Sequence, residues 1–311
     1  MSVSLNCLYE LAGTSKQSVS RHIKMKEAFQ EELLILMKEV EDLRSLHPGC
    51  GIQKMYETLM PDFIGRDQFV DIFMSLGFRV KRKKNYIKTT NSTIHEHENL
   101  IEGMVINGPN QVWQSDITYY KVDNQYHYVV FIIDVYTRVI VGYSASNSLR
   151  AESNMKALKM ALKKYGAPLV HHSDRGSQYG YKKYINMLEQ HHTHISMGDI
   201  AQDNAYAERI NRTIKEEYLD HWEINTFKRL KSCVSKAVEN YNNKRTHRGI
   251  MKKSPMQFYR EVLNLPVSNR PMATIYAEGQ KKVLLTSSHQ KLLAQQSLMA
   301  HNCPNCLTNN V

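Results

Sequence analysis

Strand-like segments between residues 112 and 144 constrain the fold more than any other part of this chain. They are rich in Val, Ile, Tyr and Phe and cover residues 112–120, 126–134 and 139–144. Helical periodicity follows at residues 152–165, 181–190, 204–219 and 227–243, with short strand-like stretches at 169–172 and 194–196. A three-strand meander followed by alternating helices and strands predicts an α/β domain on a mixed sheet. Beyond Val262 the chain has no clear periodicity.

Three carboxylates lie at informative places in this pattern. Asp116 (in WQSDITY) and Asp174 (in HSDRGSQY) end strand-like stretches, and Glu208 (in DNAYAER) lies one turn into a predicted helix. Carboxylate oxygens are the ligands that Mg²⁺ and Mn²⁺ prefer. Two such ions about 3.5–4 Å apart can activate a nucleophile and stabilise a leaving oxygen in phosphodiester chemistry. We therefore expect a catalytic metal site for two Mg²⁺ or Mn²⁺ ions at these carboxylates.

The helix that carries Glu208 has two distinct faces. Arg212 and Lys215 follow Glu208 by four and seven residues and share its face, where we expect them to bind DNA phosphate. The opposite face is apolar and consists of Tyr206, Ile210, Ile214 and Tyr218. We expect Asp203 to cap this helix, and Asn204 and Asn211 are further candidates for DNA contact. Glu216 and Glu217 are alternative third acids that point away from the face of Arg212 and Lys215.

The overall charge favours a polyanionic partner. The chain of 311 residues has a formal charge of +11 and a sequence pI near 9.3, which suits a nucleic acid. The alternative explanation of this charge is a basic, soluble protein with no nucleic-acid partner. The longest strongly apolar run, residues 128–133, is far shorter than the roughly 20 residues that cross a bilayer. With no signal-like N-terminus and five scattered cysteines, we expect a cytoplasmic protein without a membrane partner.

Residues 8–21 resemble a helix-turn-helix. A first helix is predicted to end near Ala12, Gly13 permits a tight turn, and Thr14 or Ser15 caps the second helix. The polar face of the second helix offers residue types that contact DNA in a major groove: Lys16, Gln17, Ser20 and Arg21. An ordinary capped helix pair is the alternative. A separate amphipathic helix is predicted at residues 26–44.

A second helix pair follows the break at residues 47–51. Residues 52–60 and 66–76 are predicted helices, and the densest basic run of the chain comes next: Lys81, Arg82, Lys83 and Lys84. This run is expected to bind a DNA backbone, although such runs are often only solvated. The predicted organisation is a helix-turn-helix and amphipathic helix (1–45), a second such module with a basic linker (46–95), a catalytic core (105–262) and a tail (263–311).

Ordered motifs in the core resemble a known family. Residues 111–119, 172–179 and 203–208, together with 241–248 and 254–258, are similar to the insertion-sequence transposases of the IS-three family. The similarity is to the OrfB product, which has a retroviral-integrase-like core. The helix pair at residues 52–77 resembles the helix-turn-helix module of that family. The spacing of 33 residues between Asp174 and Glu208 is slightly shorter than the family usually has, because the loop ahead of the helix is shorter.

This resemblance implies a ribonuclease H-like fold and a DDE triad of Asp116, Asp174 and Glu208, with Lys215 as the basic residue that follows the glutamate. It implies Mg²⁺-dependent strand cleavage at element ends and strand transfer, through a figure-eight and an excised circle. The expected partners are double-stranded DNA of the terminal repeats and the target, further copies of the chain on DNA, and a small DNA-binding protein from an upstream frame. The expected location is the bacterial nucleoid.

Two other functions remain open at the level of sequence. The chain could be a DNA-binding relic or regulator that keeps the fold without catalysis, or a hydrolytic nuclease without strand transfer. Cys303 and Cys306, with His301 nearby, hint weakly at a zinc site.

Overall fold

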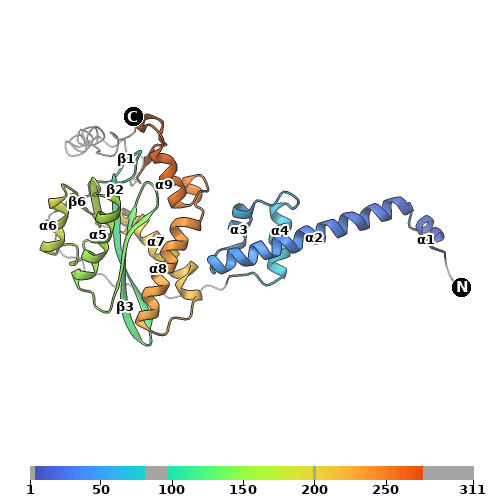
Figure 1. Cartoon of the computed structure of the whole chain (residues 1–311), viewed down its shortest axis with the longest axis horizontal. Coiled ribbons are helices and arrows are strands. Elements are labelled where there is room, and N and C mark those ends of the chain that lie inside the picture. The colour runs from blue at the N-terminus through green and yellow to red at the C-terminus, as the bar shows by residue number, and fades with distance from the viewer. Residues whose placement is uncertain (1–3, 81–96, 199–200, 276–311) are drawn as a thin grey trace, which may run out of the picture. The chain divides into compact units, whose positions relative to one another are not determined.

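The computed structural model describes residues 4–80, 97–198 and 201–275, and divides the chain into two compact units, residues 1–82 and 83–311 (Figure 1). The basic run at residues 81–84 and the cysteines of the tail lie outside the described residues. The four-part organisation expected from the sequence therefore stays a prediction.

The first unit is α-helical. Its helices are α1 (Leu5–Leu11), α2 (Lys16–Leu46), α3 (Ile52–Leu59) and α4 (Arg66–Ser75). The helices α3 and α4 pack against the C-terminal half of α2, and their shared core contains Leu36, Val40, Met55, Phe69 and Phe73. This core explains the predicted helix pair, because α3 and α4 bury their apolar faces only when α2 covers them.

The N-terminal helices differ from the prediction in one respect. The first helix, the turn at Gly13 (φ +63°) and the cap by Ser15, whose Oγ accepts from Ser18 N at 3.1 Å, are as predicted. The second helix and the amphipathic helix, predicted as separate, are one helix of 31 residues. Residues 22–25 contain no Pro or Gly that would end a helix. Every residue of α1 is at least partly exposed, so α1 adds little to the core of this unit.

The second unit is built on a five-stranded mixed sheet. Its strands are β2 (Val112–Val122), β3 (Gln125–Asp134), β4 (Ile140–Ser146), β5 (Val170–Ser173) and β6 (His194–Met197). Their order is β4-β3-β2-β5-β6. The pairs β2–β3 and β3–β4 are antiparallel, whereas β2–β5 and β5–β6 are parallel. A three-strand meander extended by parallel strands from helical crossovers is the ribonuclease H-like topology, which confirms the predicted fold class.

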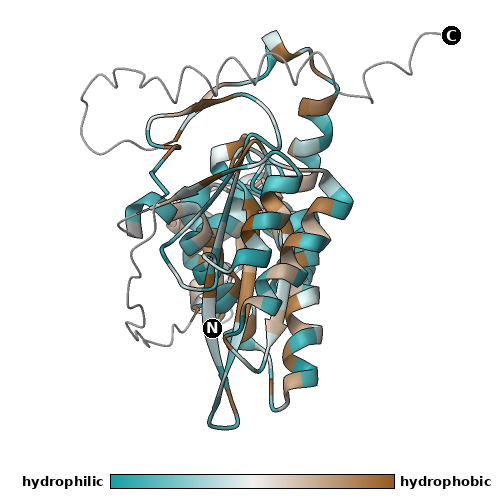
Figure 2. Cartoon of the chain, turned by 90° about the vertical axis from the view of Figure 1, so that its left-hand side faces the viewer, coloured by the Kyte–Doolittle hydropathy of each residue, from teal (hydrophilic) through white to brown (hydrophobic). Residues whose placement is uncertain are grey.

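Helices cover both faces of this sheet. The helices α5 (Ala151–Tyr165) and α6 (Lys182–Gln190) lie on one side, and α7 (Ala205–Glu217) and α8 (Phe227–Lys244) lie on the other (Figure 1). Alternate strand residues point to opposite cores. Val130 and Ile132 pack with α5 and α6, whereas Val129 and Phe131 pack with α7 and α8. The alternation of brown and teal along the helices in Figure 2 shows the matching amphipathic pattern.

This unit also contains elements that the sequence did not predict. The two-residue strands β1 (Val105–Ile106) and β7 (Ala273–Thr274) pair antiparallel. The helix α9 (Pro255–Leu263) is capped by Ser254, whose Oγ accepts from Gln257 N at 3.3 Å. Among the described residues, 3₁₀ turns cover Ala201–Asn204, Leu219–His221, Arg248–Ile250 and Val267–Asn269. Two-residue strands are too short for a period to be visible. None of the helices within the described residues is both long and apolar enough to cross a membrane.

The packing of α5 on the sheet depends on Gly142. A Cβ at this position would lie 2.2 Å from the carbonyl oxygen of Ala157 on α5. Gly142→Ala is therefore expected to push α5 away from β4 and to lower the free energy of unfolding by about 1–3 kcal/mol. Urea unfolding followed by tryptophan fluorescence measures this, because both tryptophans, Trp113 and Trp222, belong to the second unit. Gly249→Ala is the matched control, since the space around Gly249 is open; equal losses in both variants would contradict the prediction.

Candidate active site

Strand pairing brings the first two carboxylates together. The parallel register pairs Ser115 on β2 with Ser173 on β5. Asp116 and Asp174 are the next residues along these two neighbouring strands. Asp174 leaves the sheet at the end of β5, whereas β2 continues to Val122. The two carboxylates therefore meet where β5 ends beside the middle of β2.

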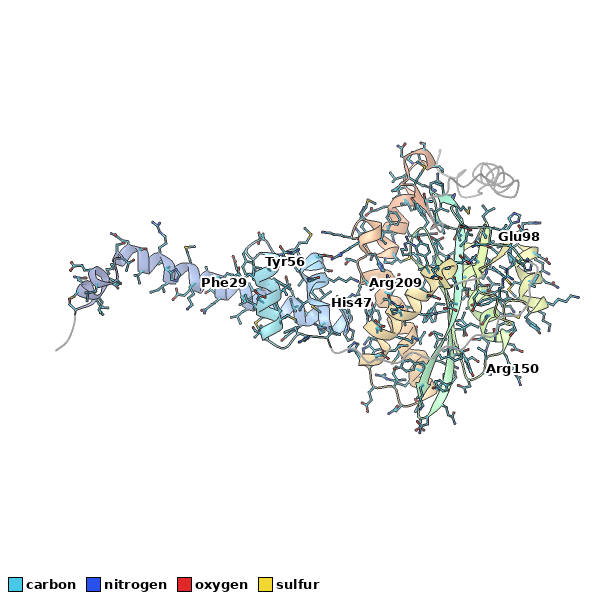
Figure 3. All side chains as sticks on the ribbon, turned by 180° about the vertical axis from the view of Figure 1, so that it is seen from behind. Phe29, His47, Tyr56, Glu98, Arg150 and Arg209 are labelled. Atoms are coloured by element: carbon cyan, nitrogen blue, oxygen red, sulfur yellow. The ribbon has the colours of Figure 1, made fainter. Side chains whose placement is uncertain are left out.

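Glu208 is brought to the same place by α7. Burial, together with the negative charges of Asp174 and Glu208, raises the pKa of Asp116 to about 7. Burial also raises the pKa of Glu208. The positive charge of Arg212 partly offsets this increase, and the negative charge of Asp174 adds to it. The next residue on α7, Arg209, lies on the side of the sheet opposite Glu98 and Arg150 (Figure 3). Acids from two strands and one helix thus share one electrostatic environment.

The donor chemistry of this site fits a hard divalent cation. All three groups offer carboxylate oxygens, and burial is the main cause that raises the pKa values of Asp116, Asp174 and Glu208. Among the described residues, no three His, Cys, Asp or Glu side chains already form a cluster with the geometry of a metal site.

Neutral donors hold the two aspartates in place. Asn211 on α7 donates from Nδ2 to Oδ2 of Asp116 at 2.7 Å, and the N–H of Ile117 donates to its Oδ1 at 2.8 Å. The N–H of Gly176 donates to Oδ1 of Asp174 at 3.2 Å. The Oδ1 of Asn211 is buried and has no hydrogen-bond partner among the described residues. Asn211 therefore orients one carboxylate and keeps an acceptor oxygen unused inside the protein.

The start of α7 is capped in a way that corrects the sequence prediction. The side chain expected to cap it was Asp203, but Asp203 lies in the preceding 3₁₀ turn. The cap comes instead from Gln114 on β2, whose Oε1 accepts from the N–H groups of Tyr206 at 3.0 Å and Ala207 at 3.3 Å. Asn204 turns inward and donates from Nδ2 to the carbonyl of Ser115 at 2.9 Å. A local motif could not predict this, because the acceptor is 92 residues away.

Two family profiles and several relatives match this architecture. Profiles described as "Integrase core domain" match residues 106–202 and 189–255. The insertion element IS600 uncharacterized 31 kDa protein of Shigella sonnei is 36% identical over 203 residues, which cover 63% of this chain and 75% of that protein. The transposase InsF for insertion sequence IS3A of Escherichia coli is 33% identical over 167 residues, or 52% of this chain and 58% of InsF. The chain belongs to the IS-three family of transposases, with an integrase-like core.

This transposase also resembles solved structures of retroviral integrases, at lower sequence identity than the relatives above. The catalytic core domain of the HTLV-2 integrase, in complex with magnesium, aligns with 49% of the transposase and 97% of that domain, at 20% identity and a TM-score of 0.42. The simian T-cell lymphotropic virus intasome, in complex with the PP2A regulatory subunit B56 gamma, aligns with 75% of the transposase and 76% of the matched chain. Its identity is 18% and its TM-score is 0.43.

The basic residues expected to bind DNA have different environments. Arg212 is exposed beside Glu208, and Lys215 is partly buried. Burial lowers the pKa of Lys215, while the charges of Asp220 and Asp116 raise it, so Lys215 also lies close to the acidic site. The four residues of the first unit that are predicted to contact DNA are exposed on the first turns of α2: Lys16, Gln17, Ser20 and Arg21. Their role in binding DNA stays a prediction.

One of the two alternative acids at the end of α7 is engaged elsewhere. Glu217 accepts two hydrogen bonds from the guanidinium of Arg245, from Nε at 2.7 Å and from Nη2 at 2.6 Å. This bidentate ion pair is largely buried and ties the C-terminal end of α7 to the end of α8. Glu217 therefore supports α7 rather than adding to the acidic site.

Sequence reasoning missed the contributions of Gln114 and Asn211. It expected Asn204 and Asn211 to contact DNA, but both are almost fully buried and bond to the protein itself. The spacing of three residues between Glu208 and Asn211 was a usable signal, since such residues share a helix face. Gln114 offered a weaker signal, a long polar side chain two residues before Asp116 in a predicted strand.

The electrostatics of Asp116 predict that this residue costs stability in the metal-free transposase. A carboxyl whose pKa is raised from 3.8 to about 7 by folding binds its proton more tightly when folded. The free energy of unfolding therefore falls as the pH rises through this window and stays lower above it. Asp116→Asn is expected to stabilise the second unit by about 1–3 kcal/mol at pH 8 in EDTA, and much less at pH 4. Urea unfolding at both pH values measures this, and a loss of stability at pH 8 would contradict it.

Proposed function

We propose that this transposase binds the ends of an insertion element, cleaves a DNA strand there and joins it to another DNA site. The proposal is supported by the neighbouring strand positions of Asp116 and Asp174 and by the charges of Asp174 and Glu208, which help to raise the pKa of Asp116. These residues would form the DDE triad and would hold Mg²⁺ or Mn²⁺, two ions per site. Bound there, the ions would activate the attacking oxygen and stabilise the leaving oxygen of a phosphodiester exchange.

The other residues of the site have roles that follow from their positions. Arg212 and Lys215 lie on the face of α7 that carries Glu208 and would bind the phosphates that flank the reacting bond. Asn211 orients Asp116 by donating to its Oδ2. In strand joining, a DNA 3′ hydroxyl attacks the target phosphorus; one phosphorus–oxygen bond forms, another breaks, and the displaced 3′ oxygen takes up a proton.

The proposed partners are double-stranded DNA and protein. The DNA partners are the terminal repeats of the element and the target site. Lys16, Gln17, Ser20 and Arg21 would contact DNA from the start of α2, and Lys81, Arg82, Lys83 and Lys84 would bind a DNA backbone. Several copies of the chain would act together on DNA, with a small DNA-binding protein from an upstream frame as a further partner.

The test uses the full-length chain and labelled element-end DNA. With Mg²⁺ or Mn²⁺, we expect nicked and joined products on a gel, because the acidic site can then neutralise charge at the reacting phosphate. EDTA should abolish both products and leave DNA binding largely intact, and added Mg²⁺ should restore them. Cleavage without joining would identify a hydrolytic nuclease instead, and DNA binding without either product would identify a regulator.

A further inference from the structure

Gln114 connects the two elements that carry the first and third acids of the site. It lies on β2, two residues before Asp116, and is fully buried. Its Oε1 accepts from the N–H groups of Tyr206 and Ala207, the two residues that precede Glu208 on α7. Its Nε2 donates to the carbonyl of Asp203 at 3.0 Å. One side-chain amide therefore binds three backbone groups at the start of α7.

These bonds replace the cap that the helix lacks locally. The first N–H groups of a helix have no partner within it and usually bond to the side chain of the N-cap residue. In α7 the N-cap residue is Asn204, whose Nδ2 bonds to the carbonyl of Ser115 instead. Two groups of β2 therefore hold the start of α7: the Gln114 side chain and the Ser115 carbonyl.

Glu208 lies between two sets of contacts with the same strand. Gln114 holds the residues just before it, and Asn211, three residues after it, donates to Oδ2 of Asp116. The axial position and the rotation of α7 relative to β2 are therefore determined on both sides of Glu208. Displacements of about 1 Å in a reacting constellation can cost a hundredfold in rate.

We propose that Gln114 is a positioning residue for the metal-dependent reaction, because its amide caps α7 from β2 and sets Glu208 against Asp116. The inference rests on the proposed function. Gln is suited to this task because its amide both accepts from two N–H groups and donates to a carbonyl. Gln114→Met keeps the volume and removes all three bonds, which frees the start of α7 to shift.

A matched control variant distinguishes a positioning role of Gln114 from a purely structural one. Asn242 on α8 makes a similar bridge to a strand: Nδ2 donates to the Ile140 carbonyl at 3.0 Å, and Oδ1 accepts from the Ile140 N–H at 2.9 Å. It is buried in the same unit, and both groups that it binds belong to β4. Asn242→Leu thus removes a buried strand–helix bridge without touching the placement of Asp116 or Glu208.

The experiment compares full-length wild type, Gln114→Met and Asn242→Leu well below their unfolding temperatures. It measures the single-turnover rate of joining on element-end DNA, the Kd for that DNA, and the Kd for Mn²⁺ by electron paramagnetic resonance without DNA. We expect Gln114→Met to lower the rate and weaken Mn²⁺ binding by about 10–100-fold, with the DNA Kd within about twofold. Asn242→Leu should leave the rate and the Mn²⁺ affinity near wild type.

Three results would overturn the positioning role of Gln114 or distinguish its failure from a failure of the proposed function. Equal rates and Mn²⁺ affinities for Gln114→Met and Asn242→Leu would overturn it. If Gln114→Met does not fold, Gln114→Asn replaces it, because the side chain is one methylene shorter and keeps an amide but is displaced from the N–H groups of Tyr206 and Ala207; an Mn²⁺ Kd and a rate equal to wild type would then overturn it. If wild type joins no DNA, the proposed function fails, while the Mn²⁺ comparison still tests Gln114.

Discussion

Asp174→Asn is expected to lower the rate of DNA strand joining by about a thousandfold and to leave binding of element-end DNA unchanged or slightly tighter. Asp174 lies directly after β5, beside Asp116 on the neighbouring strand. The amide keeps the shape of the side chain and removes the negative charge that would hold a cation. Loss of several kcal/mol of charge stabilisation in the transition state corresponds to this factor. Single-turnover joining and a gel-shift titration measure the two quantities.

The matched control for this variant is Asp134→Asn. Asp134 is also a buried acid at the end of a strand, but it accepts from Thr137 and Asn110 in a turn and lies outside the proposed triad. Asp134→Asn should affect the stability of the fold more than the rate per folded molecule. Joining that survives Asp174→Asn would disprove the proposed triad.

Arg245→Met is expected to lower the free energy of unfolding of the second unit by about 3–5 kcal/mol. The guanidinium makes a bidentate pair with Glu217, with only 12% of the Arg245 side chain and 19% of the Glu217 side chain exposed. Removal of one partner from a buried pair leaves the other charge desolvated and uncompensated. Urea unfolding followed by the fluorescence of Trp113 and Trp222 measures the loss in the second unit.

The double variant Arg245→Met with Glu217→Leu is the control for this prediction. Replacement of both charges by apolar side chains removes the uncompensated charge, so most of the lost stability should return. A loss below about 1 kcal/mol in the single variant would show that Glu217 is well solvated without Arg245. A double variant as unstable as the single one would attribute the loss to packing instead.

Much of the second unit was predictable because its signals are local. The meander from residue 112 to 146, the helices α5 to α8 and the separation of apolar from polar residues along α7 follow from periodicity and β-propensity. The cap of α8 is local as well, since Thr226 accepts from Arg229 N three residues later. The junction at residues 22–25 was predicted wrongly because a break in the hydrophobic pattern does not break a helix without Pro or Gly.

The sequence by itself determined the main strands and helices of the second unit and the place of Asp174 at a strand end, because neighbours within about one helical turn decide those properties. Its expectation that Asp116 also ends a strand was wrong, since β2 continues to Val122. Only the tertiary structure decided that Ser115 pairs with Ser173, that Gln114 caps α7 and that Asn211 orients Asp116. These contacts join residues far apart in the chain, and the partners become defined only once the strands are in register and α7 packs on the sheet. A buried amide must then bond to whatever polar group the fold places beside it.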